Sequence, residues 1–483
     1  MILALALALG ARGPVSHDAP APPTLPGLEL TAQGRFEEAL PVLDEEIKAR
    51  PQEEDLGAAK AMCLLQLGRW SEALAAARDL ADRLPADEDA RILLGDALLL
   101  NFRPREAAAV YGTVPPSSPQ ASAVLAKRVD ALAASGDDRG ALAVFTKARA
   151  DGVPVSDRML ASAARLEDDP RSRLALLREL AARRPEDAAL KGEVKVWEAL
   201  AARSPAPAVT PAYPGASKLK EIGREPSVPV RLDGKKGHWL ALDTGSDNVM
   251  VNEDTARKLH LPVLAETQYL GWGYKGPQVT AVVLLDRLDV AGRTLVNVPA
   301  VVNQRDTEFW TNKAGYVGLS PFLDGAVEYD RRGGHFGLYP SGTAPEAILG
   351  RPCTVLPVLW FRGMPLIPVM LQGRGPFPFL LDTGAPWSLL AAQHVGSLGI
   401  RVNSGKYGNL KGWGLSGAFS AGVAEQVRIG VAGVQYDRPV AFVTEVPQSF
   451  PVPVYGILGR DILNDFAMVF DGPGGRVALA RYP

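Results

Sequence analysis

The pattern of apolar and polar residues divides the chain into two parts of different texture. From residue 29 to residue 202, apolar residues recur at three- and four-residue spacing among Ala, Leu, Glu and Arg. This spacing predicts amphipathic helices. From residue 216 onward, short alternating runs rich in Val and Thr are interrupted by Gly and Pro. These runs are typical of β-strands. The sequence therefore predicts a multidomain protein with an all-α part followed by an all-β part.

Three segments lie outside these two patterns and mark the expected boundaries. Residues 1–28 hold an apolar run and then a leader rich in Pro and Ala, and residues 203–215 are again rich in Pro and Ala. The second segment predicts a semi-rigid linker. Residues 341–357 connect two β-type stretches of similar length, 216–340 and 358–483.

The helical part contains an internal repeat. The segment Gly34–Leu40 recurs as Gly68–Leu74, and Pro51, Pro85 and Pro119 keep the same step. A period of about 34 residues resembles the tetratricopeptide repeat, which implies a solenoid of stacked helix pairs with a concave face. By analogy that face binds a peptide or a protein partner. The alternative is a support or spacer domain, because the repeat determines a fold and not a ligand.

The β-type part is duplicated around the triplet Asp-Thr-Gly. The triplet occurs at positions 243–245 and 382–384, and each copy ends an apolar run. Val-Pro-Val at 228–230 and Ile-Pro-Val at 367–369 precede the two Asp residues by the same interval, and a Gly-x-x-Gly motif follows at 315–318 and 456–459. A lone triplet has little meaning. Matched flanks on both sides indicate a domain duplication that retains both carboxyl groups.

Two equivalent carboxyl groups can activate water. Carboxyl groups about 3 Å apart share one proton, because both cannot ionise against each other. The ionised group can act as a base towards water while the protonated group polarises the carbonyl of a peptide bond. We therefore predict Asp243 and Asp382 as the catalytic residues.

These motifs resemble the aspartic peptidases, and specifically a single-chain duplication of the retropepsin-like type. The resemblance implies an acid-protease barrel with pseudo-two-fold symmetry. It also implies an interlocking pair of Thr residues between the halves. Gly459-Arg460-Asp461 is similar to the Gly-Arg-Asp segment of that family, whereas the first half has Ser320-Pro321 where the acid would stand. The residues expected to support the two active-site loops are Thr244, Gly245, Ser246, Thr383, Gly384 and Ala385.

The resemblance further implies a flap hairpin over the substrate in each half. A Gly-Trp-Gly segment occupies the corresponding interval in both copies. The alternative for the two Trp residues is core packing at the base of a hairpin. The predicted flap residues are Gly271, Trp272, Gly273, Gly412, Trp413 and Gly414.

One difference between the halves concerns the residue after the triplet. It is Ser246 in the first half and Ala385 in the second. A Ser hydroxyl can donate to the outer oxygen of Asp243 and favour the charged form of that carboxyl. We therefore expect Asp243 to be the more acidic partner.

Composition narrows the remaining function classes. A net charge of −2 and a pI near 6.3 give no argument for nucleic acid. Two Cys residues exclude a disulfide scaffold, and the five His residues have no metal-ligand spacing, so we expect neither a metal nor a cofactor. The G-x-G-x-x-G matches at 271–276 and 412–417 lie within β-type sequence and do not predict a dinucleotide site.

The N-terminus predicts export. Met1–Ala11 resembles the apolar core of a secretory signal peptide, although it lacks a basic region. We expect a periplasmic or extracellular protein; a frayed apolar terminus on a cytoplasmic protein is the alternative. No run is long enough to predict a membrane span.

The sequence thus predicts an aspartic endopeptidase that acts on a peptide or protein substrate. Because both carboxyl groups lie in one chain, we expect an active monomer. The alternatives are a peptide-binding protein that clamps without cutting, and a scaffold that uses the barrel as a platform.

Overall fold

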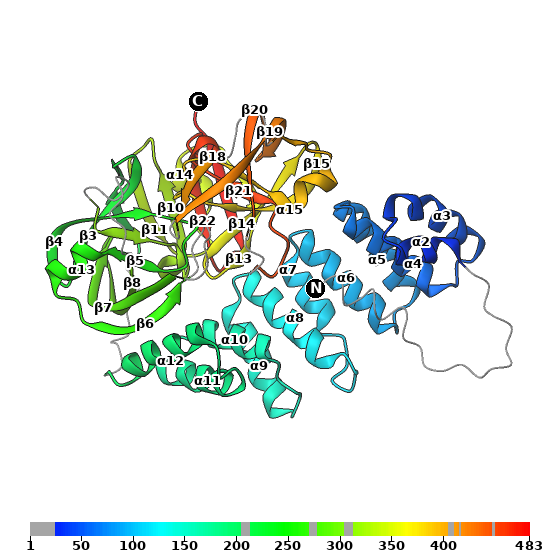
Figure 1. The fold of residues 1–483 in the computed structure, drawn as a ribbon, viewed down its shortest axis with the longest axis horizontal. Helices are drawn as coiled ribbons and strands as arrows, with labels where there is room; N and C mark the ends of the chain where they lie inside the picture. Colours follow the sequence, from blue (N-terminus) through cyan, green and yellow to red (C-terminus); the bar gives the residue numbers. More distant parts are fainter. Residues whose placement is uncertain are drawn as a thin grey trace. The chain divides into compact units, whose positions relative to one another are not determined.

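The computed structural model describes residues 25–203, 213–269, 278–303, 313–403, 410–414, 417–446 and 450–483. The chain forms two compact units (Figure 1). One unit comprises the described residues up to Ser118 together with Arg374–Pro376. The other comprises the described residues of Pro119–Gly373 and Phe377–Pro483. No described helix is long and apolar enough to cross a membrane.

The first unit consists of paired helices built on the repeat seen in the sequence. Gly34 and Gly68 have φ of 75° and 67°, a left-handed conformation that ends the preceding helix. The Ala at the shared repeat position is fully buried in three successive units, at Ala39, Ala73 and Ala107. A small residue there lets neighbouring helices approach closely. The helices are α2 (Pro26–Ala32), α3 (Phe36–Ala49), α4 (Glu54–Gln66), α5 (Trp70–Arg83), α6 (Glu88–Leu100) and α7 (Pro104–Tyr111).

The second unit begins with five more helices. Their shared core includes Val129, Phe145, Leu160 and Leu177. The helices are α8 (Ala121–Ala134), α9 (Asp138–Ala150), α10 (Asp157–Leu166), α11 (Pro170–Arg183) and α12 (Ala188–Ala201). The predicted all-α region is thus confirmed.

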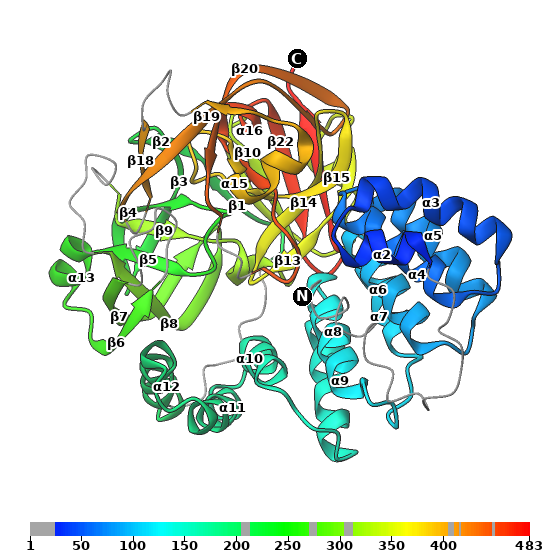
Figure 2. The same ribbon diagram turned by 45° about the vertical axis from the view of Figure 1, so that its right-hand side comes forward.

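Two of these helices pack directly on the β-type part. Val196 and Leu200 of α12 share a buried cluster with Leu284 of the first half, and α12 lies beside β6 in both ribbon views (Figures 1 and 2). The turn after α8 is equally close, since a Cβ on Gly136 would lie 2.2 Å from the carbonyl oxygen of Gly472. The last helices and the β-sheets therefore form one compact body, although the residues between them, 204–212, lie outside the described chain.

The β-type residues form two sheets of matching topology, one in each half. The first has eight strands in the order β2-β3-β4-β9-β5-β8-β7-β6. The second has nine, in the order β13-β14-β15-β21-β16-β20-β19-β17, with β18 paired to β19. In both, the strand that ends at the Asp runs parallel to a short strand that carries the Gly-x-x-Gly motif. The predicted all-β duplication is therefore confirmed.

A third sheet of six strands joins the halves, in the order β1-β11-β10-β22-β23-β12. Its central pairing is between β10 of the first half and β22 of the second, with Val327 opposite Phe470. Both strands are buried along their length.

The first half is built of β1 (Gly215–Lys218), β2 (Lys220–Ile222), β3 (Glu225–Leu232), β4 (Lys235–Leu242), β5 (Val249–Asn252), α13 (Glu253–Leu259), β6 (Val263–Tyr269), β7 (Gln278–Val290), β8 (Arg293–Asn303), β9 (Gly315–Val317), the 3-10 helix η2 (Ser320–Phe322), β10 (Ala326–Asp330) and β11 (His335–Tyr339). The connector holds α14 (Pro345–Leu349) and β12 (Thr354–Pro357). The second half is built of β13 (Leu359–Phe361), β14 (Met364–Leu371), β15 (Arg374–Leu381), β16 (Leu389–Ala391), α15 (Ala392–Val395), the 3-10 helix η3 (Gly396–Leu398), β17 (Val402–Asn403), β18 (Leu410–Gly414), β19 (Gly417–Val431), β20 (Val434–Thr444), β21 (Gly456–Leu458), α16 (Arg460–Leu463), β22 (Phe466–Asp471) and β23 (Arg476–Arg481).

Candidate active site

The two Asp residues stand at equivalent strand ends. Asp243 follows β4 and its amide donates to the carbonyl of Val317, while Asp382 follows β15 and its amide donates to the carbonyl of Leu458; both N–O distances are 3.0 Å. Both side chains are buried, with 8% and 9% of their surface exposed. The parallel pairing beneath each loop thus fixes where each carboxyl group lies.

The two Thr residues cross-link the halves. The hydroxyl of Thr244 donates to the carbonyl of Leu381 at 2.6 Å, and the hydroxyl of Thr383 donates to the carbonyl of Leu242 at 2.7 Å. Each hydroxyl also accepts the backbone N–H of the opposite Thr, at 3.0 and 3.1 Å. Four hydrogen bonds in a buried location therefore hold one loop against the other.

Each carboxyl group packs against the glycine of the opposite loop. A Cβ on Gly245 would lie 2.5 Å from Cγ of Asp382, and a Cβ on Gly384 would lie 2.6 Å from Oδ1 of Asp243. Each carboxyl group thus lies against the loop that carries the other, and the negative charge of Asp382 helps to raise the pKa of Asp243. The triplet therefore needs its glycine because no side chain fits between the two loops.

The surroundings of the two carboxyl groups are unequal. Oδ1 of Asp382 accepts the amides of Gly384 at 2.8 Å and Ala385 at 3.0 Å. Oδ1 of Asp243 accepts the amide of Gly245 at 3.0 Å, while the amide of Ser246 donates to the backbone carbonyl of Asp243. Amide donors stabilise the charged form of a carboxylate.

Burial raises the pKa of both carboxyl groups, but not to the same extent. The pKa of Asp243 lies well above its ordinary value, because burial is reinforced by the negative charge of Asp382. The pKa of Asp382 is also raised by burial, but its two amide donors oppose the change. The second amide donor therefore favours Asp382 as the more acidic partner.

The predicted role of Ser246 is wrong. Its hydroxyl lies 3.4 Å from the amide and the carbonyl of Asn248, so it does not donate to Asp243. A short-range bond to the backbone two residues on is the common alternative for Ser side chains. The expectation that Asp243 is the more acidic carboxyl loses this support, and the two amide donors to Asp382 favour the opposite order.

The Gly-Trp-Gly segments are described only in part. Gly271, Trp272 and Gly273 lie outside the described residues. The second segment forms the end of β18, where Gly412 pairs with Phe419 and Gly414 pairs with Gly417 across a hairpin. The glycine-rich motif of the second half, which includes Trp413, is therefore part of a hairpin, and its role as a flap stays a prediction.

A buried set of charged residues lies beside the dyad, and three of its members were not predicted. The carboxylate of Glu225 accepts from the ammonium of Lys313 and from the hydroxyl of Tyr316, the latter at 2.9 Å. Nη1 of Arg460 lies 3.7 Å from Glu225 and donates to the carbonyls of Thr383 and Gly384, at 3.0 and 3.3 Å. A position-by-position comparison of the halves would have found this set, since Met364 stands where Glu225 does.

Asp461, the acid of the Gly-Arg-Asp segment, supports the loop of the second half from another side. Oδ1 of Asp461 accepts the amide and the hydroxyl of Ser388, both at 2.7 Å. Ser320, the counterpart of Asp461, is exposed in the first half. The departure noted in the sequence thus removes a support of the first loop.

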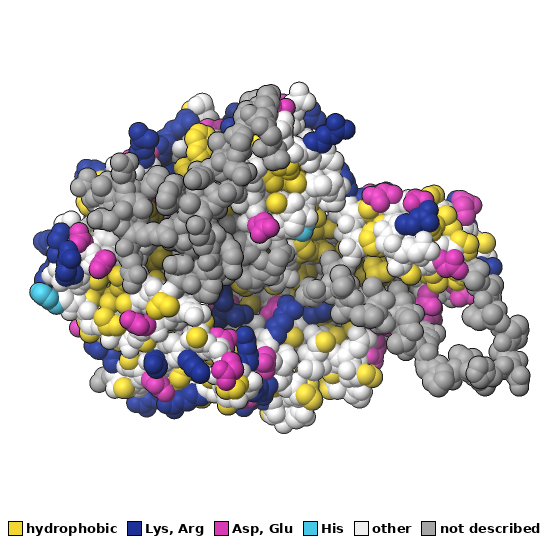
Figure 3. Space-filling model, in the orientation of Figure 1, with side chains coloured by type: hydrophobic (Ala, Val, Ile, Leu, Met, Phe, Trp, Pro, Cys, Tyr) yellow, Lys and Arg dark blue, Asp and Glu magenta, His cyan; other side chains and the backbone are white. Residues whose placement is uncertain are grey.

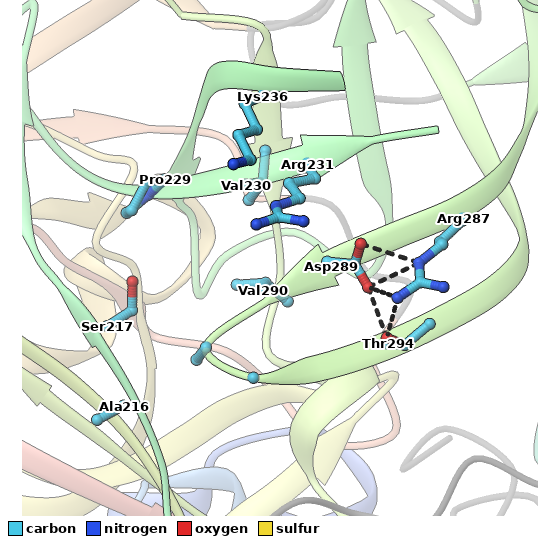
Figure 4. Close-up of a pocket in the computed structure, with 12 residues that line it drawn as sticks. Ala216, Ser217, Pro229, Val230, Arg231, Lys236, Arg287, Asp289, Val290 and Thr294 are labelled. Atoms are coloured by element: carbon cyan, nitrogen blue, oxygen red, sulfur yellow. Dashed lines mark hydrogen bonds and ion pairs between the residues drawn. The ribbon is translucent and has the colours of Figure 1, made fainter. Parts of the chain in front are cut away.

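A separate pocket of about 480 Å³ is lined by residues of the first half (Figure 4). Its lining comes from β1, β3, β4, β7 and β8 and includes Arg231, Lys236 and Arg287, which are exposed. Arg287 bonds Asp289 there. No dyad or loop residue lines this pocket, so it is distinct from the candidate active site.

The described surface carries both signs of charge. On the face shown in Figure 3, Lys and Arg alternate with Asp and Glu among the described residues. No group of three or more His, Cys, Asp or Glu side chains that could hold a metal ion occurs in the described part of the chain.

The sequence is similar to two known families. Residues 228–320 and 367–462 each match a family model described as aspartyl protease. Residues 30–87 and 64–129 match a tetratricopeptide repeat model. The chain therefore carries a duplicated aspartyl protease-like part preceded by tetratricopeptide repeats.

Similar solved structures include an aspartic proteinase and tetratricopeptide repeat proteins. An aspartic proteinase from Irpex lacteus is 13% identical with a TM-score of 0.34, covering 56% of this chain and 97% of its own. A thermophilic TPR protein of Thermus thermophilus is 21% identical with a TM-score of 0.27, covering 36% of this chain and 95% of its own. A tetratricopeptide repeat protein from Parabacteroides merdae is 14% identical with a TM-score of 0.31, covering 36% and 70%. No curated protein matches the sequence.

Proposed function

We propose that this protein is an aspartic endopeptidase in which Asp243 and Asp382 activate water to hydrolyse peptide bonds. The observation that carries the proposal is the paired geometry of the two loops. Two buried carboxyl groups at equivalent strand ends face each other, and reciprocal Thr hydrogen bonds lock them in place. The match of both halves to an aspartyl protease model supports the same chemistry.

The unequal surroundings assign different roles to the two carboxyl groups. Asp382, with two amide donors, is the ionised base that takes a proton from the attacking water. Asp243 carries the shared proton and donates it towards the carbonyl oxygen of the substrate. The water oxygen bonds to the carbonyl carbon and gives a tetrahedral intermediate with two hydroxyl groups. When the C–N bond breaks, the departing nitrogen takes the proton that Asp382 removed from water, and one hydroxyl of the intermediate returns a proton to Asp243.

An exposed aromatic residue follows the loop of Asp382 and supports a preference for apolar substrate side chains. Trp387 stands five residues after Asp382 and is 57% exposed. Its ring packs edge-on against Phe442, with centroids 6.1 Å apart. The equivalent residue in the first half is Asn248. The second half would therefore favour a large apolar side chain.

The tetratricopeptide repeats provide a surface on which a protein partner or the substrate could dock. We further propose that the protein works as a monomer, since one chain supplies both carboxyl groups. Export to the periplasm or exterior is proposed from the apolar run Met1–Ala11.

The proposed activity is tested by cleavage of a broad peptide library at several pH values. Asp243→Asn and Asp382→Asn should each reduce the rate by about 10²–10⁴-fold, the usual contribution of general acid–base catalysis. Asp289→Asn is the matched control, because this carboxylate pairs with Arg287 away from the dyad. It should cleave like the wild type.

Two results would contradict the proposal. Equal cleavage by the wild type and both dyad variants would remove the dyad from the reaction. Binding of peptides without cleavage at any pH would favour a peptide-binding protein instead. Separately, if only a dimer cleaved on size fractionation, the intramolecular dyad would be wrong.

A further inference from the structure

The charged set beside the dyad has no counterpart in the other half. Glu225 is the first residue of β3, and Met364 is the first residue of β14. Lys313 lies two residues before β9, and Val454 lies two residues before β21. At the two remaining positions, Tyr316 corresponds to Ile457 and Arg460 corresponds to Leu319. The set is therefore charged on one side of the pseudo-two-fold axis and apolar on the other.

All eight side chains are shielded from water, which makes the difference electrostatically important. Lys313 has a fully buried side chain, and the side chains of Glu225 and Arg460 are 9% and 11% exposed. Met364, Val454, Ile457 and Leu319 are all buried. Charges in a buried location act on their neighbours more strongly than charges in water.

Arg460 is connected to Asp382 through two peptide groups. Its Nη1 donates to the carbonyl of Thr383, and the N–H of the same peptide group, on Gly384, donates to Asp382. Nη1 also lies 3.3 Å from the carbonyl of Gly384, and the N–H of that peptide group, on Ala385, donates to Asp382 as well. A cation at the carbonyl end of a peptide group strengthens donation by its N–H.

Glu225 pairs with Arg460, while Lys313 and Tyr316 bond Glu225 from the other side. Glu225 comes from β3 and Tyr316 from β9 of the first half, whereas Arg460 begins α16 near the C-terminal end (Figure 2). With Glu225 ionised and both Lys313 and Arg460 protonated, the set carries one net positive charge. A dyad that shares one proton carries one net negative charge, so the two buried groups balance.

We propose that Glu225, Lys313, Tyr316 and Arg460 form a positioning set that keeps Asp382 ionised and places the dyad proton on Asp243. The inference rests on the proposed function in one respect: the location of the dyad proton matters only if the dyad hydrolyses peptide bonds. The set acts through the loop of Asp382 and does not touch the reacting atoms.

The groups that face the set are consistent with this charge state. Burial and the charge of Arg460 lower the pKa of Lys313 to about 8, so Lys313 remains a cation at acidic and neutral pH. Burial raises the pKa of Tyr316 and of Tyr329 on β10, and both phenols stay neutral. The remaining ionisable groups acting on Arg460 are Asp243 and Asp382 themselves.

The test measures the titration of each carboxyl group directly, by ¹³C NMR of full-length protein labelled at the Asp carboxyl carbons. Asp243→Asn and Asp382→Asn assign the two signals. In the wild type, Asp382 should lose its proton at a lower pH than Asp243. Arg460→Gln removes the charge and keeps the Glu225–Lys313 pair. It should raise the midpoint of Asp382 by about 1 pH unit or more.

Two variants distinguish charge from structure. Arg460→Lys retains the charge and should keep the order of the two midpoints. The fourfold variant Glu225→Met, Lys313→Val, Tyr316→Ile and Arg460→Leu copies the apolar set of the other half. It should bring the titration midpoints of Asp243 and Asp382 together. If Arg460→Gln does not fold, this variant takes its place in the test.

The outcomes separate this inference from the proposed activity. A folded Arg460→Gln or fourfold variant that titrates like the wild type overturns the positioning set, even if the wild type cleaves peptides. If the two midpoints are separate in the wild type and converge in Arg460→Gln or the fourfold variant, the positioning set is supported. This holds even if the wild type cleaves no peptide. In an active enzyme, the acid limb of kcat/KM should move with the midpoint of Asp382.

Discussion

The two halves of the β-type part share their backbone and differ in their electrostatics. Both Asp residues end a strand, both bond a parallel strand beneath, and both Thr residues reach across to the other half. Yet Asp382 accepts two amides and has Arg460 behind its loop, while Asp243 accepts one amide and has Leu319 at the equivalent position. Backbone geometry must be equal for two carboxyl groups to meet. Unequal charge around the two groups favours one of them as the holder of the proton.

This comparison predicts that substitutions in the shared backbone affect both halves alike. Gly245→Ala and Gly384→Ala should each reduce cleavage by about 10²–10⁴-fold, the range expected when general acid–base catalysis is lost. In both cases the new Cβ meets the carboxyl group of the opposite half at 2.5–2.6 Å. Steady-state cleavage of one peptide substrate measures the loss.

A glycine in open space provides the control. No atom of the described residues lies within 4 Å of a Cβ on Gly396, and this residue has helical backbone angles. Gly396→Ala should therefore cleave like the wild type. If Gly245→Ala were silent while Gly384→Ala was inactive, the two loops would not be equivalent even in their backbone.

A second prediction concerns the supports that differ between the halves. Asp461→Asn weakens two short hydrogen bonds from Ser388 and the interaction with Arg438 at 3.4 Å. It should lower the free energy of unfolding by about 1.5–3 kcal/mol, the range for hydrogen bonds to a charged group. Ser320→Ala, at the equivalent exposed position, should change it by less than about 0.5 kcal/mol. Chemical denaturation of both variants measures the difference.

The pattern in the sequence was sufficient for those features that depend on local residues. The Asp-Thr-Gly triplets, their apolar strands and the helical repeat are each written within a short stretch, so the two folds and the pairing of Asp243 with Asp382 could be predicted. The partnership of Glu225 with Arg460 could not, because they stand near opposite ends of the β-type part and only the packing of the halves brings them together. The same is true of Gly136, whose approach to Gly472 joins the helices to the sheets.

The smallest expected effect is the sharpest test of what makes the halves unequal. Ser246 is buried, but within the described part of the chain its hydroxyl makes two long contacts, both to the backbone of Asn248. Ser246→Ala should therefore cost less than about 1 kcal/mol of stability. It should leave both limbs of the pH–rate profile in place, because no hydrogen bond to Asp243 is lost.

The sign of the pH dependence follows from the two pKa directions. The proposed activity requires Asp382 ionised and Asp243 protonated, so it should fall when the pH drops below the pKa of Asp382 and when it rises above that of Asp243. The raised pKa of Asp243 extends activity towards higher pH than an exposed carboxyl group would allow. The profile of Ser246→Ala is compared with that of Arg460→Gln, which should move the acid limb upward. An acid limb that moved in Ser246→Ala and stayed in Arg460→Gln would assign the inequality to the residue after the triplet and not to the buried charges.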